Sequence, residues 1–355
     1  MLLTIVSFVF VLGILIFIHE LGHFLVAKRV GVRVEKFSLG FPPNIFTRKR
    51  GDTEYCIGLI PLGGYVKMTG ENPEEETTGA ADEFSSKTVG QRAAVIMAGP
   101  FMNYLLAIVF LIGIIYFSGK PVVDDTRIIV GEVTQDGPAF NASLQPDDII
   151  IGINGESVAH FDSLRTRINA VVEDTVEITW LHGADTIQEK IVTQLTELPN
   201  IDGGIDTVGM IGFSQKISYY ERFGLLESVG KGFISAHVIV WETVKFVKKA
   251  VTGQVSAKMI GGPVFIAQQS GREARKGAAS LFFFMALLSV NLAVLNILPI
   301  PILDGGHLVF LLVEKVRGGP LSLKARGIAQ QIGLLLLLAV ILMVTYNDIM
   351  RLFAG

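Results

Sequence analysis

Long apolar segments dominate the pattern of hydrophobic and polar positions along the chain. Four stretches are almost free of charge, and each has the ~20 residues that a helix needs to cross the ~30 Å hydrocarbon core of a bilayer. The pattern therefore predicts transmembrane helices at residues 1–27, 93–118, 278–303 and 327–350. The first has no basic residues ahead of its apolar run and no small-residue cleavage site before His19, so we interpret it as a retained span.

Between the first two spans, residues 28–92 alternate in part between apolar and polar positions and are punctuated by glycine and proline. This pattern predicts short strands and hairpins rather than a simple linker. Such a backbone can enter a membrane only where it packs on protein or lines a wet cavity. We therefore expect a membrane-associated β-hairpin region here, followed by a polar loop.

The polar segment after the second span predicts a folded module. Strand-like runs alternate with turn signals, and residues 161–172 have helical spacing. The order of these elements resembles that of a bacterial PDZ domain in circularly permuted form, spanning residues 124–215. The usual PDZ pattern has glycines where this chain has Ser143 and Asp147.

A late stretch of the module resembles the loop with which PDZ domains bind a peptide carboxylate. It comprises Gly209, Met210, Ile211, Gly212 and Phe213. The resemblance implies that the module can add an extended peptide terminus to its sheet edge; the alternative is a spacer domain with a degenerate groove. Residues 221–276 follow, and their helical periodicity predicts an amphipathic helix and a linker at the membrane surface.

Composition agrees with a multi-span membrane protein. Hydrophobic residues make up 50% of the 355-residue chain and charged residues 18%, which is too apolar for an ordinary soluble enzyme. The formal net charge of -3 and the lack of a basic stripe argue against a nucleic-acid binder. The single cysteine, Cys56, excludes an internal disulfide and a multi-cysteine metal site.

The distribution of Lys and Arg predicts the orientation in the membrane. Basic residues are frequent in the loop at 28–92 and in the loop between the last two spans, which holds Lys315, Arg317, Lys324 and Arg326. Basic loops face the cytoplasm. We therefore expect the module outside the cell membrane, in the periplasm or the extracellular space, and both chain termini facing outward.

The sequence His19-Glu20-Leu21-Gly22-His23 carries the candidate chemistry. On a helix, residues four apart project from one face, so both imidazoles can bind one Zn²⁺. Glu20 lies beside them, where it can take a proton from an attacking water. The alternative is two hydrogen-bonded histidines on a buried helix. Polar groups at the end of an apolar span are costly, however, unless they are paired or bound to a metal.

A catalytic zinc site with two histidines needs a third protein ligand. Asp304 is the acidic residue at membrane depth, and it ends the run Asn296-Ile297-Leu298-Pro299-Ile300-Pro301-Ile302-Leu303-Asp304. The prolines interrupt the helix, and the glycines that follow permit a close backbone approach. Asp304 could instead cap the next helix. Capping alone does not explain the dense proline and glycine setting, which favours the ligand role.

Together these motifs resemble the site-2 protease family of intramembrane zinc metalloproteases, over nearly the whole chain. His19 through His23 match the family's zinc helix, and Asn296 through Gly305 match its second signature at every defined position. The resemblance implies a polytopic α-helical membrane protein with four transmembrane helices, a membrane-associated β-hairpin region and an inserted α+β PDZ domain. One PDZ copy is clear, so the resemblance is to the single-PDZ type of the bacterial branch.

The resemblance also implies roles and partners. His19, His23 and Asp304 would hold Zn²⁺. Glu20 would act as general base and then as general acid, while the Asn296 amide would hold the oxyanion or the substrate backbone. Substrates would be single-span membrane proteins already cut by another protease, such as anti-sigma factors or remnant signal peptides. The expected location is the bacterial inner membrane, in contact with lipid and not with nucleic acid.

Two other classes of protein are compatible with part of the pattern. One is a membrane-anchored PDZ adaptor with a non-catalytic metal site, against which the intact Glu20 argues. The other is a metal transporter, against which the single metal-binding motif and the lack of an inverted repeat argue. The identity of the substrate, the trigger for cleavage and the oligomeric state are not encoded in any recognisable motif.

Overall fold

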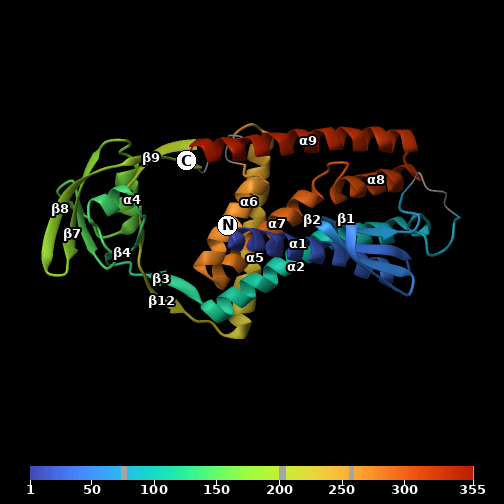
Figure 1. Cartoon of the computed structure of the whole chain (residues 1–355), viewed down its shortest axis with the longest axis horizontal. Coiled ribbons are helices and arrows are strands. Elements are labelled where there is room, and N and C mark those ends of the chain that lie inside the picture. Colours follow the sequence, from blue (N-terminus) through green and yellow to red (C-terminus); the bar gives the residue numbers. More distant parts are fainter. Residues whose placement is uncertain (73–77, 200–204, 256–259, 355) are drawn as a thin grey trace. The chain divides into compact units, whose positions relative to one another are not determined.

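The chain is described here from a computed structural model that covers residues 1–72, 78–199, 205–255 and 260–354. Parts of the expected hairpin region, module and linker fall at 73–77, 200–204 and 256–259, outside the described residues. The chain forms two compact units (Figure 1). The membrane unit comprises residues 1–114, 225–248 and 260–355, and the inserted unit comprises residues 115–224 and 249–259.

Four described helices are long and apolar enough to cross a membrane. They are α1 (Leu2–Arg29), α2 (Val89–Ser118), α7 (Ala278–Ile297) and α9 (Leu323–Ala354). Their apolar side chains pack together inside the membrane unit. Val11 and Leu15 of α1 contact Met285 of α7, and a second buried cluster joins α2, α7 and the helix α5 (Leu225–Val251).

The third span is shorter than the sequence predicts. The apolar run was expected to continue as a helix to residue 303, but α7 ends at Ile297. Leu298 precedes Pro299 and is extended, with φ -60° and ψ 145°, because a residue before proline is driven out of the helical region. The next helix, α8 (Asp304–Arg317), begins after the second proline.

The expected amphipathic helix and linker at 221–276 are two helices, α5 and α6 (Pro263–Lys276). Asp348 of α9 caps α6: its carboxylate accepts hydrogen bonds from the backbone N–H groups of Gly262, Val264 and Phe265 at 2.9 to 3.0 Å. A carboxylate suits this position because the first N–H groups of a helix have no partner within it. The cap therefore ties α6 to the last helix.

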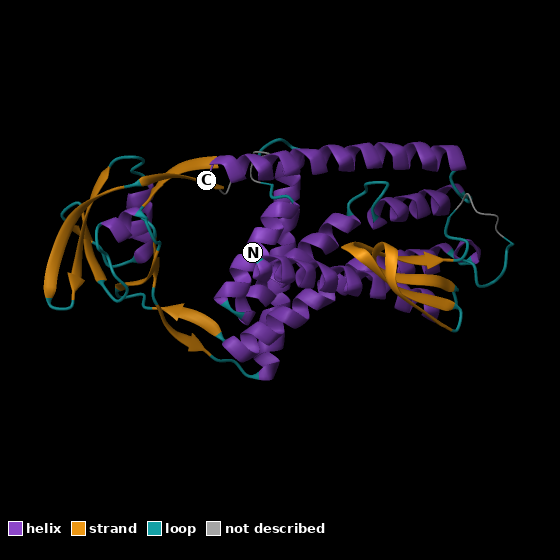
Figure 2. Cartoon of the chain, in the orientation of Figure 1, coloured by secondary structure: helices purple, strands orange, loops and turns teal. Residues whose placement is uncertain are grey.

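The region after α1 is a sheet of short strand segments, as its glycines and prolines indicated. It is formed by the runs β1 (Val34–Arg50) and β2 (Thr53–Met68), which are joined by a turn at Gly51. Residues 46–50 pair with residues 53–57 around this turn, while residues 36–39 pair on one side with residues 54–57 and on the other with residues 64–67. The part of the sheet nearest α1 packs on α1 and α2, with Cys56 buried. A short 3-10 helix η1 (Phe84–Ser86) precedes α2, and Figure 2 shows the strands of this region beside the helices of the membrane unit.

The inserted unit is built on an antiparallel sheet of six strands and two short helices. The strand order is β11-β4-β5-β7-β8, with β6 paired to β5. The strands are β4 (Ile128–Val133), β5 (Ile149–Ile153), β6 (Glu156–Ser157), β7 (Thr175–His182), β8 (Asp185–Val192) and β11 (Phe213–Gln215). Helices α3 (Pro138–Asn141) and α4 (Phe161–Asn169) complete it, and Trp180 is fully buried in the core.

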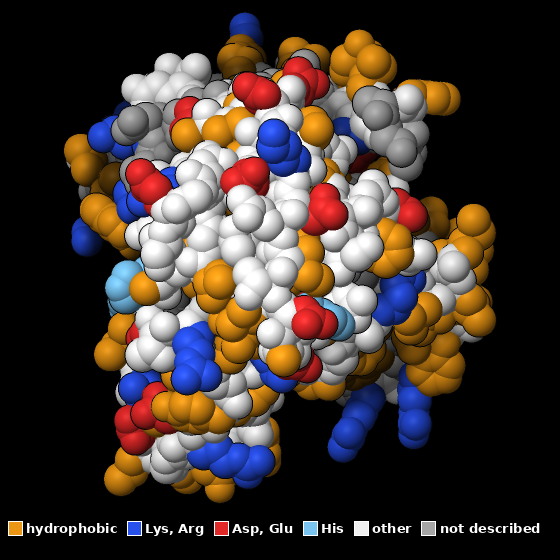
Figure 3. All heavy atoms as spheres, turned by 90° about the vertical axis from the view of Figure 1, so that its left-hand side faces the viewer, with side chains coloured by type: hydrophobic (Ala, Val, Ile, Leu, Met, Phe, Trp, Pro, Cys, Tyr) orange, Lys and Arg blue, Asp and Glu red, His pale blue; other side chains and the backbone are white. Residues whose placement is uncertain are grey.

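Two further strand pairs belong to the same unit. They are β3 (Lys120–Val123) with β12 (Ile217–Glu221), and β9 (Gln194–Pro199) with β10 (Ile205–Met210). The face of the molecule in Figure 3 carries acidic and basic side chains interspersed with polar ones. The element order of the unit agrees with the module expected at 124–215.

Candidate active site

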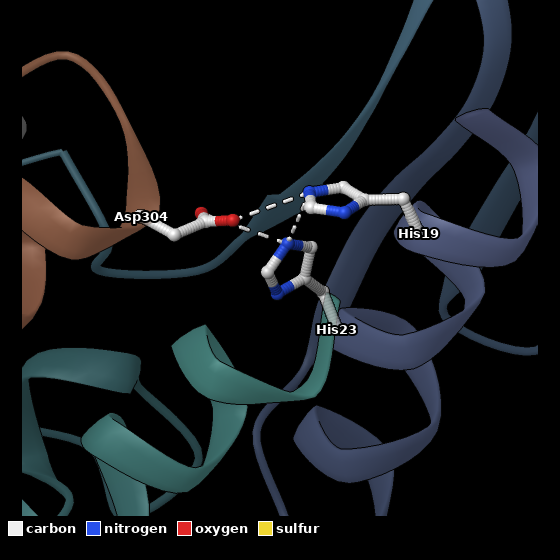
Figure 4. A group of neighbouring side chains, drawn as sticks. All are labelled: His19, His23 and Asp304. Carbon is white, nitrogen blue, oxygen red and sulfur yellow. Dashed lines mark hydrogen bonds and ion pairs between the residues drawn. The ribbon is translucent and has the colours of Figure 1, made fainter. Parts of the chain in front are cut away.

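His19 and His23 lie one turn apart on α1 and point toward Asp304, the first residue of α8 (Figure 4). The two Nε2 atoms are 3.2 Å apart. Asp304 Oδ2 is 3.2 Å from His19 Nε2, and Oδ1 is 3.7 Å from His23 Nε2. The structure thus brings together three side chains that the motifs place at the two ends of the chain.

The local backbone explains how Asp304 reaches the histidines. Residues 298–303 leave the helical path between α7 and α8, and the two glycines after Asp304 pack on that segment. A Cβ on Gly305 would lie 2.1 Å from the Ile297 carbonyl oxygen, and one on Gly306 would lie 2.3 Å from that of Ile300. Only glycine permits this close turn.

Capping does not account for Asp304. Leu303 occupies the N-cap position of α8, and no side chain caps that helix. Asp304 Oδ2 is buried and accepts no hydrogen bond. A buried carboxylate oxygen without a donor is unfavourable unless a cation satisfies it.

The donor set fits zinc. Zn–N and Zn–O bonds of about 2.0–2.1 Å imply a separation of about 3.3 Å between ligand atoms at a tetrahedral ion. Two of the three measured separations are 3.2 Å. Two neutral imidazoles and one carboxylate are also a common ligand set for catalytic zinc. Within the described ranges, this is the one group of three or more His, Cys, Asp or Glu side chains close enough to hold an ion.

Helix α2 packs unusually close to the two histidines. A Cβ on Gly99 would lie 2.3 Å from His23 Nε2 and 2.8 Å from His19 Cε1, and one on Gly22 would lie 2.3 Å from the Ala98 carbonyl oxygen. The structure shows close packing against the imidazole rings.

Both histidines also have a partner on α2, and sequence reasoning missed these partners. His23 Nδ1 is 2.8 Å from the Val95 carbonyl oxygen, which can only accept, so Nδ1 carries a proton. His19 Nδ1 is 3.3 Å from Nδ2 of Asn103, a side chain with no exposed surface. The signal that could have found Asn103 is a polar amide inside an otherwise apolar span.

Glu20 lines a cavity of about 270 Å³ beside the histidines and Asp304. The Cγ atom of Glu20 packs on β2, because a Cβ on Gly64 would lie only 3.1 Å from it. The cavity is also lined by Tyr65 and Val66 of β2, by Phe84 of η1 and by His307 of α8. Glu20 therefore faces the space in which a substrate bond could approach the three converging side chains.

Asn296 is the fifth predicted site residue at this position. Its Nδ2 is 3.5 Å from His19 Nε2. Asn291, one turn earlier on α7, instead accepts a hydrogen bond of 2.7 Å from Thr243 on α5. His307 lines the cavity but does not belong to the converging group.

The inserted unit has an apolar groove of about 100 Å³ between α4 and residues 210–213. Met210, Ile211, Gly212 and Phe213 of the expected peptide loop line this groove. Gly209 does not line it, and a Cβ there would lie 1.6 Å from the Val171 carbonyl oxygen.

The membrane-length helices and the converging His, His and Asp side chains are features of a membrane-embedded metalloprotease. The sequence pattern of peptidase family M50 matches residues 7–340. Zinc metalloprotease RasP of Geobacillus kaustophilus is 32% identical over 99% of this chain and 98% of its own length. Regulator of sigma-W protease RasP of Bacillus subtilis is 30% identical over 99% of both chains.

The chain belongs to peptidase family M50, and it is a zinc metalloprotease with four membrane-length helices among its described residues. This result confirms the family resemblance and the zinc cofactor that the motifs predicted. Among solved structures, a PDZ domain of the SdrC-like protein of Listeria monocytogenes is 28% identical, covers 26% of this chain and 90% of its own, and gives a TM-score of 0.21. That match does not define the fold of the inserted unit.

Proposed function

We propose that this protease cleaves peptide bonds within the transmembrane segments of single-span membrane proteins, in regulated intramembrane proteolysis. His19, His23 and Asp304 would hold Zn²⁺. The observation that carries the proposal is their convergence at one end of a membrane-length helix, beside the cavity that Glu20 lines.

Each side chain has a separate role in the proposed reaction. Zn²⁺, when bound, would polarise the scissile carbonyl and lower the pKa of water toward ~7. Glu20 takes the proton of the attacking water and returns it to the leaving amine. The Asn296 amide, close to His19, donates to the oxyanion or to the substrate backbone.

The substrate must leave its helical conformation before it can be cut, because a helix hides its carbonyls in internal hydrogen bonds. Strand β2 forms the wall of the cavity at Gly64, Tyr65 and Val66. Residues 64–67 of β2 pair on one side with residues 36–39 and have no further strand partner among the described residues, and an unwound segment can add to such an edge. We propose that this edge of β2 presents the extended substrate to Glu20.

The name of one relative supports a proposal for the substrate class. The Bacillus subtilis relative is named a regulator of sigma-W. We propose that the natural substrates are anti-sigma factors or remnant signal peptides, released by an earlier cut outside the membrane. The protein would lie in the bacterial inner membrane, with the loops at 28–92 and 304–326 in the cytoplasm and both termini outward.

Residues 124–215 of the inserted unit would act as a PDZ domain on the outward side. Strand β11 ends the sheet order, so one of its edges is open, and the groove at residues 210–213 lies beside it. We propose that this groove receives the new terminus of the trimmed substrate, while the unit and α5 exclude substrates with bulky outward domains. The same groove supports the second candidate function, a membrane-anchored adaptor that binds peptides without cutting them.

Substitution of Glu20 separates the two functions. We expect Glu20→Gln to abolish cleavage of a tagged single-span substrate in membranes while zinc content and substrate capture persist. Glu242→Gln, on an exposed ion pair of α5, is the control and should cleave normally. Unchanged cleavage by Glu20→Gln would refute the protease mechanism, and purified protein without zinc would favour the adaptor.

A further inference from the structure

Asn103 lies against the edge of the His19 ring that faces away from Asp304. Its side chain is fully buried, and Nδ2 is 3.3 Å from His19 Nδ1. The other polar atom of the amide, Oδ1, is buried without a hydrogen-bond partner. A buried amide oxygen with no donor is rare in folded proteins and requires an explanation.

The explanation lies in the two forms of a neutral histidine. A histidine that binds a metal through Nε2 carries its ring proton on Nδ1, and that proton is normally donated to an acceptor. His23 meets this requirement through the Val95 carbonyl oxygen at 2.8 Å. For His19 the corresponding group is the Asn103 amide, which can either donate through Nδ2 or accept through Oδ1.

The two orientations of the amide have opposite consequences for His19. With Nδ2 toward the ring, the amide donates to Nδ1, and the ring proton belongs on Nε2, where it blocks metal binding. With Oδ1 toward the ring, the amide accepts the proton of Nδ1, and the Nε2 lone pair is free. Half a turn of the amide exchanges the two atoms with almost no change in shape.

We propose that Asn103 is the positioning residue of His19: when zinc binds, its Oδ1 accepts the Nδ1 proton and holds the ring in the metal-binding tautomer. The proposal rests on the proposed zinc role of His19. It also gives the unpartnered Oδ1 a function. The backbone of α2 is fixed at this point because Ser289 of α7, itself fully buried, donates a hydrogen bond of 2.7 Å to the Asn103 carbonyl oxygen.

Zinc affinity of the purified full-length protein, measured in detergent against a competing chelator, tests the proposal. We expect Asn103→Leu to weaken zinc binding by about 10–100-fold, the usual cost of losing a partner of a ligating histidine. Asn103→Asp should stay within a few-fold of the unmutated protein, because a carboxylate can accept the Nδ1 proton. Asn291→Leu is the matched control, since it removes another amide in the membrane unit that bonds Thr243 and not a histidine.

A second measurement reports the tautomer itself. In ¹⁵N-histidine NMR spectra of the zinc-loaded, unmutated protein, the His19 signal should show a proton on Nδ1 and none on Nε2. The signal is assigned by its loss in His19→Ala. A proton on Nε2 in the zinc-loaded protein overturns the proposal, and this result does not depend on whether Asn103→Leu folds.

The outcomes also separate this inference from the proposed function. Unchanged zinc affinity in Asn103→Leu, or an equal loss in Asn103→Leu and Asn103→Asp, overturns the role of Asn103 alone. A His19→Ala protein that binds zinc as tightly as the unmutated protein overturns the proposed metal site, and with it the basis of the inference.

Discussion

Arg92 of α2 and Glu314 of α8 form a bidentate ion pair within the membrane unit. Arg92 Nη1 is 3.1 Å from Oε2 and Nη2 is 2.5 Å from Oε1, with 11% and 12% of the two side chains exposed. Arg326 of α9 adds a contact of 3.7 Å to Glu314. Because α8 begins at Asp304, this pair fixes the helix that carries the third candidate ligand.

Glu314→Gln should therefore destabilise the protein and loosen the metal site. It leaves two largely buried guanidinium groups without a counter-charge, and breaking a buried pair from one side costs about 3–5 kcal/mol. Thermal unfolding in detergent measures the stability, and chelator competition measures zinc binding. Glu242→Gln breaks an exposed pair with Lys245 and should cost less than about 1 kcal/mol. An equal effect of both substitutions would contradict a special role for Glu314.

Gly99→Ala should impair zinc binding with little change of polarity. The added methyl would lie 2.3 Å from His23 Nε2, so either the imidazole or α2 must move. We expect a loss of zinc content and of cleavage in the purified protein. Gly113→Ala lies on the same helix, where a Cβ meets nothing within 4 Å, and should behave like the unmutated protein. Normal zinc content in Gly99→Ala would show that the close packing is not required.

Asp348→Ala should release the start of α6 from α9. Three buried or part-buried N–H groups lose their acceptor, and each unsatisfied donor costs about 1–3 kcal/mol before relaxation. Hydrogen exchange at Gly262, Val264 and Phe265 should become faster, and the unfolding temperature should fall. Tyr346→Phe, at an exposed position of α9, provides the comparison. Unchanged exchange at these amides would mean that the cap does not hold α6.

The contribution of Glu83 to the stability of the region near the cavity should be lost at low pH. The hydroxyl and the backbone N–H of Thr78, together with the N–H of Gly79, donate to its carboxylate at 2.7 to 3.1 Å. These bonds hold the pKa of Glu83 below its ordinary value near 4.5. Because the folded pKa is the lower one, the stabilisation is complete above the unfolded pKa and is lost as the pH falls through the folded pKa.

Unfolding temperatures of the unmutated protein and Glu83→Gln, compared across pH, test this expectation. The unmutated protein should be more stable at pH 7, and the difference should shrink below pH 4.5. A difference that does not vary with pH would show that Glu83 acts through its shape alone. The residue bears on the cavity because the adjacent Phe84 forms part of its wall.

The principal site residues could be predicted because their positions in the sequence determine which side chains can lie close together. Two histidines four apart share a helix face, and Asp304 follows prolines that end a span at membrane depth. The structure places Glu20 and Asn296 beside them, and the roles of all five residues remain proposals. The four apolar spans were predictable for the same reason, since length and hydrophobicity alone determine whether a helix can cross a bilayer.

Other features depend on contacts between distant segments and left little trace in the sequence. Asn103 meets His19 only because α2 packs at Gly99; an amide inside an apolar span marks Asn103 as unusual, but nothing local indicates its partner. The end of α7 at Ile297 could have been predicted from Leu298-Pro299, but the continuous apolar run concealed it. The short strands after α1 were predictable from glycines and prolines, but the pairing of residues 36–39 with two separate segments of β2 was not, because it depends on contacts between distant segments.

The wide sequence separation within the candidate site has a consequence for biosynthesis. His19 and Asn296 are 277 residues apart, and Asp304 follows later still. A ribosome therefore completes α1, α2 and the whole inserted unit before it makes the last candidate ligand. Until that point the growing chain carries two of the three candidate ligands and cannot form the complete set.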